Sequence, residues 1–531
     1  MTGFLHQTLA QLFESTAIPT HSAIPGIKIT GITLDSRTVQ PGYLFVAIEG
    51  MNTDGHLYIP QAVERGAVAV IGSREEVTCP VPYIQVHDPR AAVAHLSAAF
   101  YGFPARQLTV IGVTGTDGKT TTANLIYQIL LQAGCRSGIV STVNATIDGE
   151  TLDTGFHVTT PEAPEVQRIL SRMQAAGLTH VVLEATSHGL AQHRVAACEF
   201  DVAVVTNITH EHLDYHGTYE AYREAKGRLF TSLLNTHVKS QGNPRAAVIN
   251  LDDSSYDYLS GLYPGRKIAY SMRVAGKKGI ESLFASDIHP LPSGLSFTAK
   301  GPGFVFSVES PLVGLFNVSN CLAAIGATVV ALGIPVSAAQ RGIAAMGGVP
   351  GRMERIDLGQ SFTAIVDFAH TPNALKVALE TMRESLQLTG GAGRLIAVFG
   401  SAGLRDVQKR RMMAEVSASL ADLSIFTAED PRTESLDGIL GDMAQGATSQ
   451  GGVEGQTFMR IAGRGEAIRF AVQQARPGDV VIACGKGHEQ SMAFGTIEYP
   501  WDDRVAMRAA LAESLGIAGP AMPYLPTQAS S

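Results

Sequence analysis

The segment GVTGTDGKTTT, residues 112–122, combines three glycines with a lysine and a run of hydroxyl side chains. Glycines let the backbone curl so that its N–H groups point inward, and a following helix adds the positive end of its dipole, so the segment suits a phosphate. Lys119 can then reach the β- and γ-phosphates, and the hydroxyl of Thr120 can ligate Mg²⁺. Position 113 is Val, so the spacing is GxxGxxGKT rather than the general phosphate-loop pattern. The segment predicts nucleotide binding by Gly115, Thr116, Asp117, Gly118, Lys119, Thr120 and Thr121.

Two further segments carry groups that suit a metal ion. Glu184 closes the apolar run HVVLEA and can hold Mg²⁺ directly or through a water, and the alternative for this residue by itself is a helix cap. Residues 207–230, NITHEHLDYHGTYEAYREAKGRLF, hold three histidines and two nearby carboxylates without the HExxH pattern of zinc hydrolases. By themselves, these histidines are ordinary polar contacts and Lys226 is a solvated surface lysine.

The elements around these segments alternate between strands and helices. LTVIGV, residues 108–113, predicts a buried strand before the glycine loop, and residues 119–134 predict a helix that ends at Gly134. Residues 158–177 predict a second helix, and HVVLEA, FDVAVVTNI and AAVINLDD predict three more strands. This order predicts a mainly parallel, doubly wound sheet. Residues 28–100 and the region after residue 351 repeat the α/β alternation, residues 101–107 read as a linker, and residues 266–310 read as a β-rich insertion.

Length and composition bound the possible functions. A chain of 531 residues suggests three or four domains at about 150 residues each. A net charge of −8 and an aromatic content of 7% argue against nucleic-acid binding. Five cysteines without a CxxC pair, and no visible secretory signal, indicate a cytoplasmic protein. The uncharged stretch between Glu309 and Arg341 is interrupted by polar residues, so it predicts a buried helix and no membrane insertion.

Eight segments in one order resemble the Mur ligases. GVTGTDGKTTT, LEATSHGLAQHRV, NITHEHLDYHGT and ACGKGHE are similar to the family as a whole. LDSRTVQPGYLFVAIEG, VDFAHTPNAL, AEDPRTE and YPWDDR narrow the resemblance to the MurE type, the UDP-N-acetylmuramyl-tripeptide synthetases. The resemblance extends from about residue 25 to about residue 515.

The resemblance implies an α/β fold with the three-domain Mur ligase architecture. Residues 1–103 are then an N-terminal domain that binds the UDP-precursor. Residues 104–350 are a central P-loop ATP-binding domain with a mainly parallel sheet, which includes the β-rich insertion. Residues 351–531 are a C-terminal, Rossmann-like α/β domain that binds the amino acid.

The activity implied is an ATP-dependent, ADP-producing ligase of peptidoglycan synthesis. Such an enzyme adds a diamino acid to UDP-N-acetylmuramoyl-L-alanyl-D-glutamate through an acyl phosphate, with ATP and Mg²⁺, and we expect a monomer. Matching positions assign the UDP-precursor to Ser36, Thr159, Thr160, Thr186, Gln192 and Arg194. They assign the metal to Thr120, Glu184, His212 and a carbamylated Lys226. They assign catalysis to Lys119, Glu184, His212 and Lys226. Further ATP contacts are implied for Asn320, Arg352, Asp367 and His370.

The incoming diamino acid is implied to meet Arg405, Asp430, Pro431, Arg432, Gly485 and Glu489. Asp430 departs from the family pattern, because diaminopimelate enzymes usually have DNPR where this chain has EDPR. An ionised Asp430 attracts a distal ammonium and repels a distal carboxylate, whereas Arg432 favours diaminopimelate. Meso-diaminopimelate, lysine and ornithine therefore all stay open.

Two other functions are alternatives. The first is another amide ligase of the superfamily, such as the enzyme that adds D-Ala-D-Ala or a folylpolyglutamate synthase, against which DPR and GKGHE argue. The second is a non-catalytic P-loop regulatory protein. ATP hydrolysis that depends on both the UDP-precursor and a diamino acid separates the proposed ligase from the regulatory protein.

Overall fold

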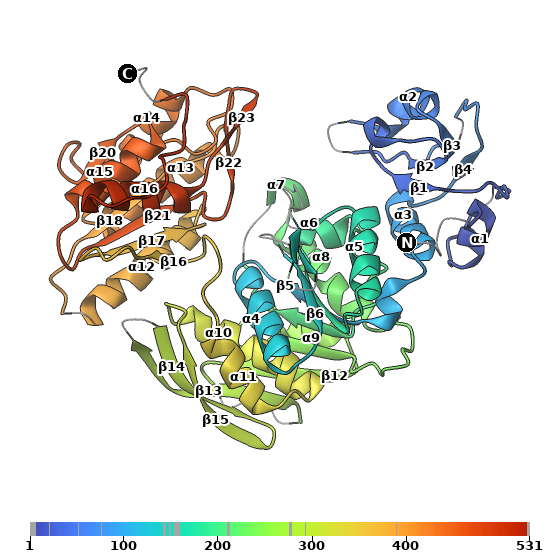
Figure 1. Ribbon diagram of the computed structural model, residues 1–531, viewed down its shortest axis with the longest axis horizontal. Helices are drawn as coiled ribbons and strands as arrows, with labels where there is room; N and C mark the ends of the chain where they lie inside the picture. The colour runs from blue at the N-terminus through green and yellow to red at the C-terminus, as the bar shows by residue number, and fades with distance from the viewer. Residues whose placement is uncertain are drawn as a thin grey trace. The chain divides into compact units, whose positions relative to one another are not determined.

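The computed structural model describes residues 7–20, 22–50, 53–75, 77–141, 145–147, 150–152, 160–209, 213–274, 279–291, 294–388 and 390–527. The chain forms two compact units. The first comprises Met1–Ser286, Thr298–Ser307 and Val318–Ala345, and the second Asp287–Phe297, Val308–Asn317 and Met346–Ser531. Figure 1 shows their elements.

The first unit begins with a small parallel sheet in the order β1-β2-β3-β4. Its strands are β1 (Gly31–Thr33), β2 (Tyr43–Val46), β3 (Ala67–Gly72) and β4 (Tyr83–Gln85). Its helices are α1 (Leu9–Glu14), α2 (Ile59–Glu64) and α3 (Pro89–Phe100), with short turns η1 (Ser36–Thr38) and η2 (Gly55–Tyr58). The predicted alternation of strands and helices is confirmed in this part of the chain.

The predicted linker after α3 is an ordered turn, η3 (Pro104–Gln107). Pro104 and Ala105 are buried. The guanidinium of Arg106 lies 3.8 Å from the centroid of the Phe103 ring and 2.9 Å from the Glu199 carboxylate. The middle of the segment is therefore buried within the first unit, which its glycine, proline and charge did not indicate.

The central sheet has eleven strands in the order β15-β14-β13-β12-β11-β10-β5-β9-β6-β7-β8. Its first strands along the chain are β5 (Thr109–Thr114), β6 (Ser137–Val140), β7 (Ala145–Ile147), β8 (Glu150–Leu152), β9 (His180–Glu184), β10 (Val202–Val205) and β11 (Ala246–Asn250). β5 pairs in parallel with both β9 and β10, whereas β7 pairs antiparallel to β6 and β8. β5 thus lies between β9 and β10, where the order in which the chain adds strands to the sheet reverses direction. Ligands commonly bind at such a position in α/β folds.

The predicted β-rich insertion extends this sheet. It contains β12 (Arg266–Ser271), β13 (Glu281–Leu291), β14 (Gly294–Gly301) and β15 (Phe304–Ser310), and β12 pairs in parallel with both β11 and β13. The uncharged stretch that follows forms α10 (Phe316–Ile325) and the π-helical segment η4 (Gly326–Ala331). No helix among the described residues is long and apolar enough to cross a membrane.

The remaining helices of the first unit surround the central sheet. They are α4 (Lys119–Gln132), α5 (Ala163–Ala175), α6 (Ser187–Ala191), α7 (Leu213–His216), α8 (Tyr219–Ser232), α9 (Tyr256–Leu262) and α11 (Val336–Ala344). The apolar residues of α5 and α8 share one core cluster with β5 and β9. α5 begins at Ala163 rather than near residue 158, because Pro161 disfavours helical backbone at the residue before it, whereas Pro164 lies in the first turn, where its missing N–H is tolerated.

The second unit has a six-stranded sheet in the order β16-β17-β21-β18-β19-β20, parallel except for β16. Its strands are β16 (Glu354–Ile356), β17 (Thr363–Asp367), β18 (Leu395–Phe399), β19 (Leu423–Phe426), β20 (Phe458–Arg460) and β21 (Val480–Cys484). Its helices are α12 (Pro372–Leu388), α13 (Val407–Leu420), α14 (Leu436–Ser449), α15 (Arg464–Gln474) and α16 (Asp503–Leu515). Alternate residues of β18 enter two separate cores, so helices cover both faces as the Rossmann-like prediction requires.

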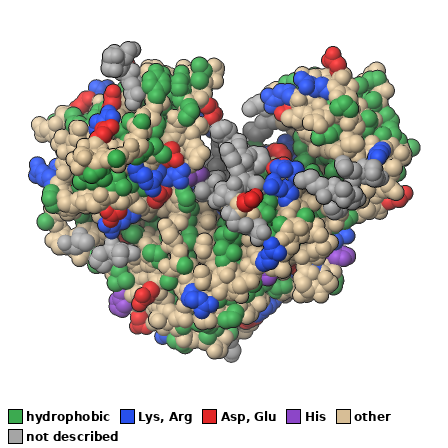
Figure 2. All heavy atoms as spheres, in the orientation of Figure 1, with side chains coloured by type: hydrophobic (Ala, Val, Ile, Leu, Met, Phe, Trp, Pro, Cys, Tyr) green, Lys and Arg blue, Asp and Glu red, His purple; other side chains and the backbone are tan. Residues whose placement is uncertain are grey.

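A hairpin of β22 (Ser491–Phe494) and β23 (Ile497–Pro500) completes this unit. On the face drawn in Figure 2, acidic and basic side chains are interspersed with apolar ones. Because charges of both signs mix there, anionic ligands need local cations to hold them.

Candidate active site

The glycine loop joins β5 to α4, and its backbone is tightly constrained. Gly115 and Gly118 have φ values of 149° and 79°, a region that favours glycine. A side chain at Gly118 would collide with Oδ1 of Asn320, and one at Gly115 would collide with Oγ1 of Thr206. The predicted ATP residue Asn320 therefore lies directly against the loop, and its Oδ1 also accepts a 3.3 Å hydrogen bond from Thr122. The loop leads into the N-terminus of α4, whose N–H groups suit a phosphate.

Two neighbouring residues that sequence reasoning missed hold this loop. Asn207 Oδ1 accepts a 3.0 Å hydrogen bond from the N–H of Asp117, and its Nδ2 donates to the Asp117 carbonyl at 3.1 Å. The Thr206 hydroxyl donates to the same carbonyl at 2.6 Å. Both residues follow β10, in the segment VVTNI. Their polarity at the end of an apolar strand was the signal available in the sequence.

Thr120 and Glu184 meet at the start of α4. The Thr120 hydroxyl donates to both carboxylate oxygens of Glu184, at 3.0 and 3.1 Å, and both side chains are buried. A hydroxyl and a carboxylate are oxygen ligands of the kind that Mg²⁺ prefers, so these two residues fit the predicted metal. Lys119 bends back over the loop, where its Nζ donates to the Thr116 carbonyl at 2.8 Å. Thr121 is also buried in the first turn of α4.

Lys226 is buried, with 1% of its surface exposed, so the interpretation as a solvated surface lysine is wrong. Its Nζ donates to the Gly115 carbonyl and lies 4.6 Å from the centroid of the Tyr222 ring. Tyr222 and Leu229 are fully buried and share its face of α8 at helical spacing, which turns Lys226 toward the phosphate loop. The predicted metal ligand His212 lies outside the described residues, as does Thr159.

The other predicted contacts to the UDP-precursor fall into one cluster and one separate position. Thr160 and Thr186 place their hydroxyl oxygens 3.1 Å apart, and Thr186 caps α6. Arg194 donates to the Thr160 carbonyl at 2.7 Å, to Oε1 of Gln192 at 2.7 and 3.0 Å, and pairs with Glu162 at 2.7 Å. Burial lowers the pKa of Arg194, and the charge of Glu162 opposes this.

Ser36 lies in the small N-terminal sheet region and is buried. Its hydroxyl donates to Oε1 of Gln61, on α2, at 2.7 Å. Ser36 and the Thr160 cluster thus come from different segments of the first unit, and their joint contact with the UDP-precursor stays a prediction.

In the second unit, the three predicted ATP residues gather around Phe368, just after β17. Asp367 accepts hydrogen bonds from the backbone N–H groups of Met353 (2.7 Å) and Ala369 (2.8 Å). The Arg352 guanidinium lies 4.3 Å from the Phe368 ring centroid, and Nδ1 of His370 lies 3.0 Å from the Phe368 carbonyl. Asp367 thus fixes the loop from which the other two side chains project.

The EDPR segment follows β19 and is held in an unusual backbone conformation. Asp430 and Arg432 have φ values of 42° and 53°, on either side of the buried Pro431. The Arg432 guanidinium donates to the Gly403 carbonyl at 2.8 Å, and Arg405 is exposed. The segment is tied to the β22–β23 hairpin, because the N–H of Arg432 donates to Ala493 at 3.1 Å and its carbonyl accepts from Gly495 at 2.8 Å.

The GKGHE segment follows β21 and meets EDPR through Lys486. Its Nζ lies 3.0 and 3.1 Å from the two oxygens of Asp430 and 2.5 Å from Oε2 of Glu489. Burial lowers the pKa of Lys486, but the two carboxylates outweigh burial and raise it overall. The structure therefore brings Asp430, Gly485 and Glu489 together around a lysine that sequence reasoning did not single out.

Family models match most of the chain in three consecutive parts. Residues 28–101 match the Mur ligase family catalytic domain, residues 113–328 the Mur ligase middle domain, and residues 351–487 the Mur ligase glutamate ligase domain. A UDP-N-acetylmuramyl-tripeptide synthetase of Roseiflexus sp. (strain RS-1) is 42% identical over 523 residues, which cover 97% of this chain and 100% of the relative.

The chain belongs to the Mur ligase family. Members of this family are ATP-dependent amide ligases. A 2,6-diaminopimelate-adding relative, the UDP-N-acetylmuramoyl-L-alanyl-D-glutamate ligase of Geobacillus thermodenitrificans (strain NG80-2), is 41% identical over 91% of this chain and 95% of the relative. The solved structure of a ligase with the same description is 31% identical, has a TM-score of 0.65, and covers 96% of this chain and 99% of that one. The predicted family, MurE type and α/β Mur ligase fold are confirmed.

A buried ion pair behind the C-terminal loops of this Mur ligase was not predicted. Arg464 pairs with Asp503 at 2.6 and 2.7 Å, and both side chains are 0% exposed. Arg464 also donates to the carbonyls of Ala428 (3.1 Å) and Cys484 (2.8 Å), and Nε1 of Trp501 donates to Asp503 at 2.8 Å. Arg464 thereby links the residues just before EDPR and GKGHE, and the YPWDDR motif supplies both Asp503 and Trp501.

Glu429, the first residue of EDPR, is buried beside Gly485. Its Oε2 has no hydrogen-bond partner among the described residues, and a side chain at Gly485 would collide with it. Burial raises the pKa of this carboxyl to about 7, although the charges of Lys409, Arg464 and Lys486 oppose the rise. Gly485 therefore leaves room for a carboxyl group that is partly protonated near neutral pH.

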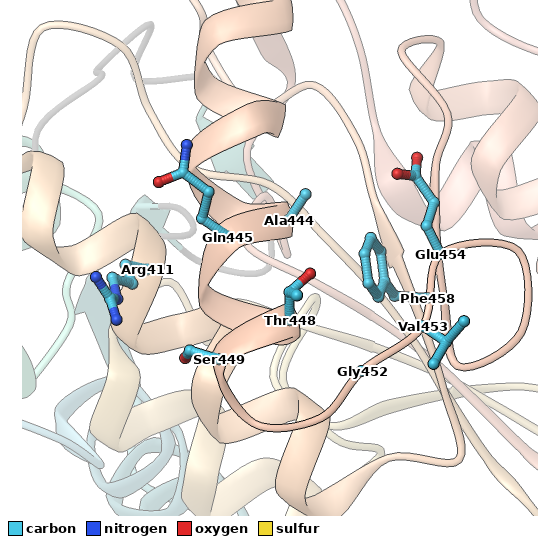
Figure 3. A pocket seen from close by; sticks show the side chains of 9 residues that line it. All are labelled: Arg411, Ala444, Gln445, Thr448, Ser449, Gly452, Val453, Glu454 and Phe458. Carbon is cyan, nitrogen blue, oxygen red and sulfur yellow. The ribbon is translucent and has the colours of Figure 1, made fainter.

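Two further features lie away from the predicted site residues. A shallow pocket in the second unit is lined by residues of α14 and the turn before β20, with Arg411 and Phe458 at its sides (Figure 3). None of the predicted site residues lines it.

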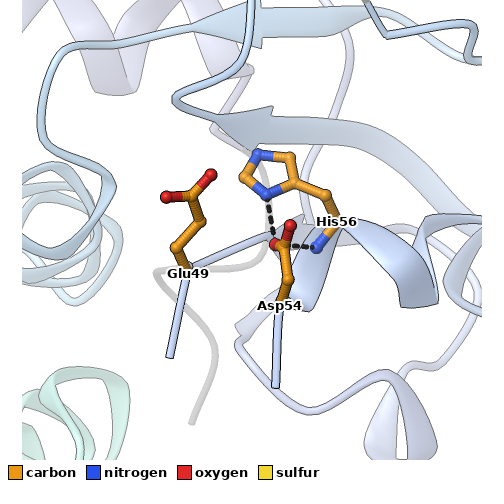
Figure 4. Close-up of side chains that lie close together, drawn as sticks. All are labelled: Glu49, Asp54 and His56. Carbon is orange, nitrogen blue, oxygen red and sulfur yellow. Dashed lines mark hydrogen bonds and ion pairs between the residues drawn. The ribbon is translucent and has the colours of Figure 1, made fainter. Parts of the chain in front are cut away.

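In the N-terminal part of the Mur ligase, Asp54 caps η2 and accepts from Nδ1 of His56 at 2.7 Å, with Glu49 beside them (Figure 4). Arg74 also pairs with Asp54. Capping and ion pairing account for this arrangement without a metal.

Proposed function

We propose that this Mur ligase joins a diamino acid to UDP-N-acetylmuramoyl-L-alanyl-D-glutamate while ATP becomes ADP and phosphate, in peptidoglycan synthesis. The observation that carries the proposal is the buried arrangement of the phosphate loop, Thr120, Glu184 and Lys226. It provides a phosphate cradle, a fitting pair of Mg²⁺ ligands and a buried amine in one place. The names of the relatives support the same UDP-linked precursor and the same class of incoming amino acid.

The reaction follows from the poor reactivity of a free carboxylate. In the first step a carboxylate oxygen of the precursor attacks the γ-phosphorus of ATP, the bond to the bridging oxygen breaks, and ADP leaves. In the second step the neutral amine of the diamino acid attacks the acyl carbon, and the tetrahedral intermediate collapses with loss of phosphate and a proton. Positioning and charge stabilisation do most of the work in such transfers.

The chain's own residues take definite parts in this scheme. Lys119 and the N–H groups at the start of α4 bind the β- and γ-phosphates. Thr120 and Glu184 would hold Mg²⁺, which when bound supplies positive charge against the transferring phosphoryl group. The roles predicted for Asn320, Arg352, Asp367 and His370 in ATP binding are part of the proposal.

Lys226 is proposed to be carbamylated. Its ammonium would first lose a proton, and the neutral amine would then add to CO₂, forming an N–C bond and releasing a second proton, so that a buried cation becomes an anion. Burial of Lys226 beside the phosphate loop supports this proposal, because an anion there can take part in a metal site with Thr120 and Glu184. The predicted ligand His212 belongs to the same proposal.

Domain boundaries near residues 103 and 350, a monomeric state and a cytoplasmic location stay predictions. The location is supported by the five free cysteines, which suit a reducing compartment.

One assay tests the proposed function. ADP release is followed in the presence of the UDP-precursor and of meso-diaminopimelate, lysine or ornithine in turn. The mass of the product is measured by mass spectrometry. We expect ADP release to need both substrates and the product mass to rise by one diamino-acid residue. D-Ala-D-Ala and glutamate are matched controls for the other amide ligases. ATP hydrolysis that is independent of both substrates would instead favour the regulatory protein.

A further inference from the structure

Lys486 lies beneath the predicted diamino-acid site and joins two of its carboxylates. Only 2% of its side chain is exposed, against 20% for Asp430 and 41% for Glu489. Its ammonium is within 3.1 Å of both oxygens of Asp430 and 2.5 Å from Glu489. The two carboxylates therefore reach the solvent side of the site, whereas their shared cation stays behind them.

Asp430 is held in this orientation from a second direction. Its Oδ1 accepts a 2.9 Å hydrogen bond from the backbone N–H of Ala493 on β22, and its backbone has a positive φ. Both carboxylate oxygens are thus directed toward fixed partners. A substrate ammonium does not meet a free carboxylate at this position, so the charge of Asp430 acts together with that of Lys486.

The charges of the site can be counted with Lys486 included. Arg405 and Arg432 contribute two positive charges, and Asp430 and Glu489 contribute two negative charges, so these four residues are balanced. Lys486 leaves an excess of one positive charge. The charges of Lys486 and Asp430 act on one another strongly, because they are 3.0 Å apart and Lys486 is buried, so solvent screens them little.

Two buried charged groups near Lys486 leave much of this excess in place. Glu429 is buried, and its carboxyl is partly protonated near neutral pH. Arg464 is neutralised by Asp503 at 2.6 Å. The excess positive charge of the site therefore comes from Lys486.

We infer that Lys486 is a specificity-determining residue, which by neutralising Asp430 lets the site accept a diamino acid that carries a second carboxylate. Without Lys486, Asp430 would act as an uncompensated anion, and the site would favour a substrate whose distal end carries only an ammonium. This inference rests on the proposed function. Lys486 acts through Asp430 and is a positioning residue, not a catalytic one.

The test compares four proteins: the full-length chain, Lys486→Met, Asp430→Asn and the double variant. The readout is the ratio of kcat/KM for meso-diaminopimelate to kcat/KM for lysine. Where the unaltered chain turns over only one of them, the inhibition constant of the other replaces its kcat/KM. We expect Lys486→Met to lower the ratio about tenfold and Asp430→Asn to raise it about tenfold. The double variant, which removes one charge of each sign, should return to within about threefold of the unaltered chain.

Lys376→Met is the matched control, because Lys376 lies on the same unit with 56% of its side chain exposed. The double variant keeps the net charge of the site, although Glu489 loses its buried cation, and its melting temperature is compared with that of each single variant to detect misfolding. Equal losses with both substrates and an unchanged ratio would show a merely structural role and overturn the inference. So would a double variant whose ratio stays tenfold away from that of the unaltered chain. If the unaltered chain ligates none of the three diamino acids, the proposed function fails first, and the inference fails with it.

Discussion

The hydroxyl of Thr120 donates to both carboxylate oxygens of Glu184, at 3.0 and 3.1 Å. Thr120 comes from the first turn of α4, and Glu184 ends β9, the strand that pairs with β5. The carboxyl end of one strand and the helix that follows its neighbour therefore supply two oxygen-bearing side chains of the kind that Mg²⁺ prefers. A metal held there would lie at the helix N-terminus that receives the phosphates.

Removal of the Thr120 hydroxyl should reduce catalysis more than nucleotide binding. We expect Thr120→Val to lower kcat of the ligation about 100-fold or more, because it removes an oxygen ligand while nearly keeping the volume. Initial rates across a series of Mg²⁺ concentrations measure this change. Thr179→Val, at an exposed threonine outside the site, is the control and should keep normal activity. A Thr120→Val protein with an unaltered Mg²⁺ dependence would contradict the metal role.

Lys226→Ala should lose most activity, because the proposed carbamate disappears with the amine. Added short carboxylates such as acetate should restore part of the rate, since they can occupy the vacated space and supply an anion. The unaltered chain incubated with ¹³C-labelled CO₂ should show a carbamate signal by NMR that the variant lacks. Near-normal activity of Lys226→Ala would rule the carbamate out of the mechanism.

The buried pair of Arg464 and Asp503 should matter for stability far more than an exposed pair. We expect Asp503→Asn to lower the free energy of unfolding by roughly 3–5 kcal/mol, because it leaves the Arg464 charge buried without its partner. Glu454→Gln breaks the half-exposed pair with Arg460 and should cost less than about 1 kcal/mol. Denaturant unfolding measures both. Trp501→Phe, which removes the hydrogen bond to Asp503 and part of a buried aromatic ring, should also lower the free energy of unfolding.

Glu429 should make stability depend on pH between about 4.5 and 7. Its pKa is about 7 in the folded chain, against an ordinary 4.5, so the folded chain keeps a proton that the unfolded chain releases in this range. The free energy of unfolding therefore falls as pH rises through this window and levels off above it. Across this window, ionisation of Glu429 alone should lower the free energy of unfolding by about 3 kcal/mol.

Glu429→Gln should remove this contribution. The difference in melting temperature between the variant and the unaltered chain should grow in favour of the variant from pH 5 to pH 8. Glu454→Gln serves again as the exposed control. A difference that stays constant with pH would show that the Glu429 carboxyl ionises normally.

The sequence predicted the elements around the phosphate loop closely, because glycine spacing and apolar periodicity are local signals. Predicted helix 119–134 is α4, and the predicted strands correspond to β5, β9, β10 and β11. Local signals could not predict the burial of Lys226 or the position of Lys486 between Asp430 and Glu489. Each depends on which face of an element meets a residue far away in the chain, such as Gly115 for Lys226 and Asp430 for Lys486. The partners of Arg464 were hidden for the same reason, since Ala428 and Cys484 offer only backbone carbonyls.

The attachment of the β22–β23 hairpin to EDPR affects how substrate preference can be engineered. Asp430 and Arg432 form hydrogen bonds with the hairpin through Ala493 and Gly495. An exchange of residues 429–432 between relatives would therefore insert a loop whose backbone partners belong to the other protein. The loop and the hairpin should therefore be exchanged together. Such an exchange should keep the backbone hydrogen bonds that position Asp430 and Arg432.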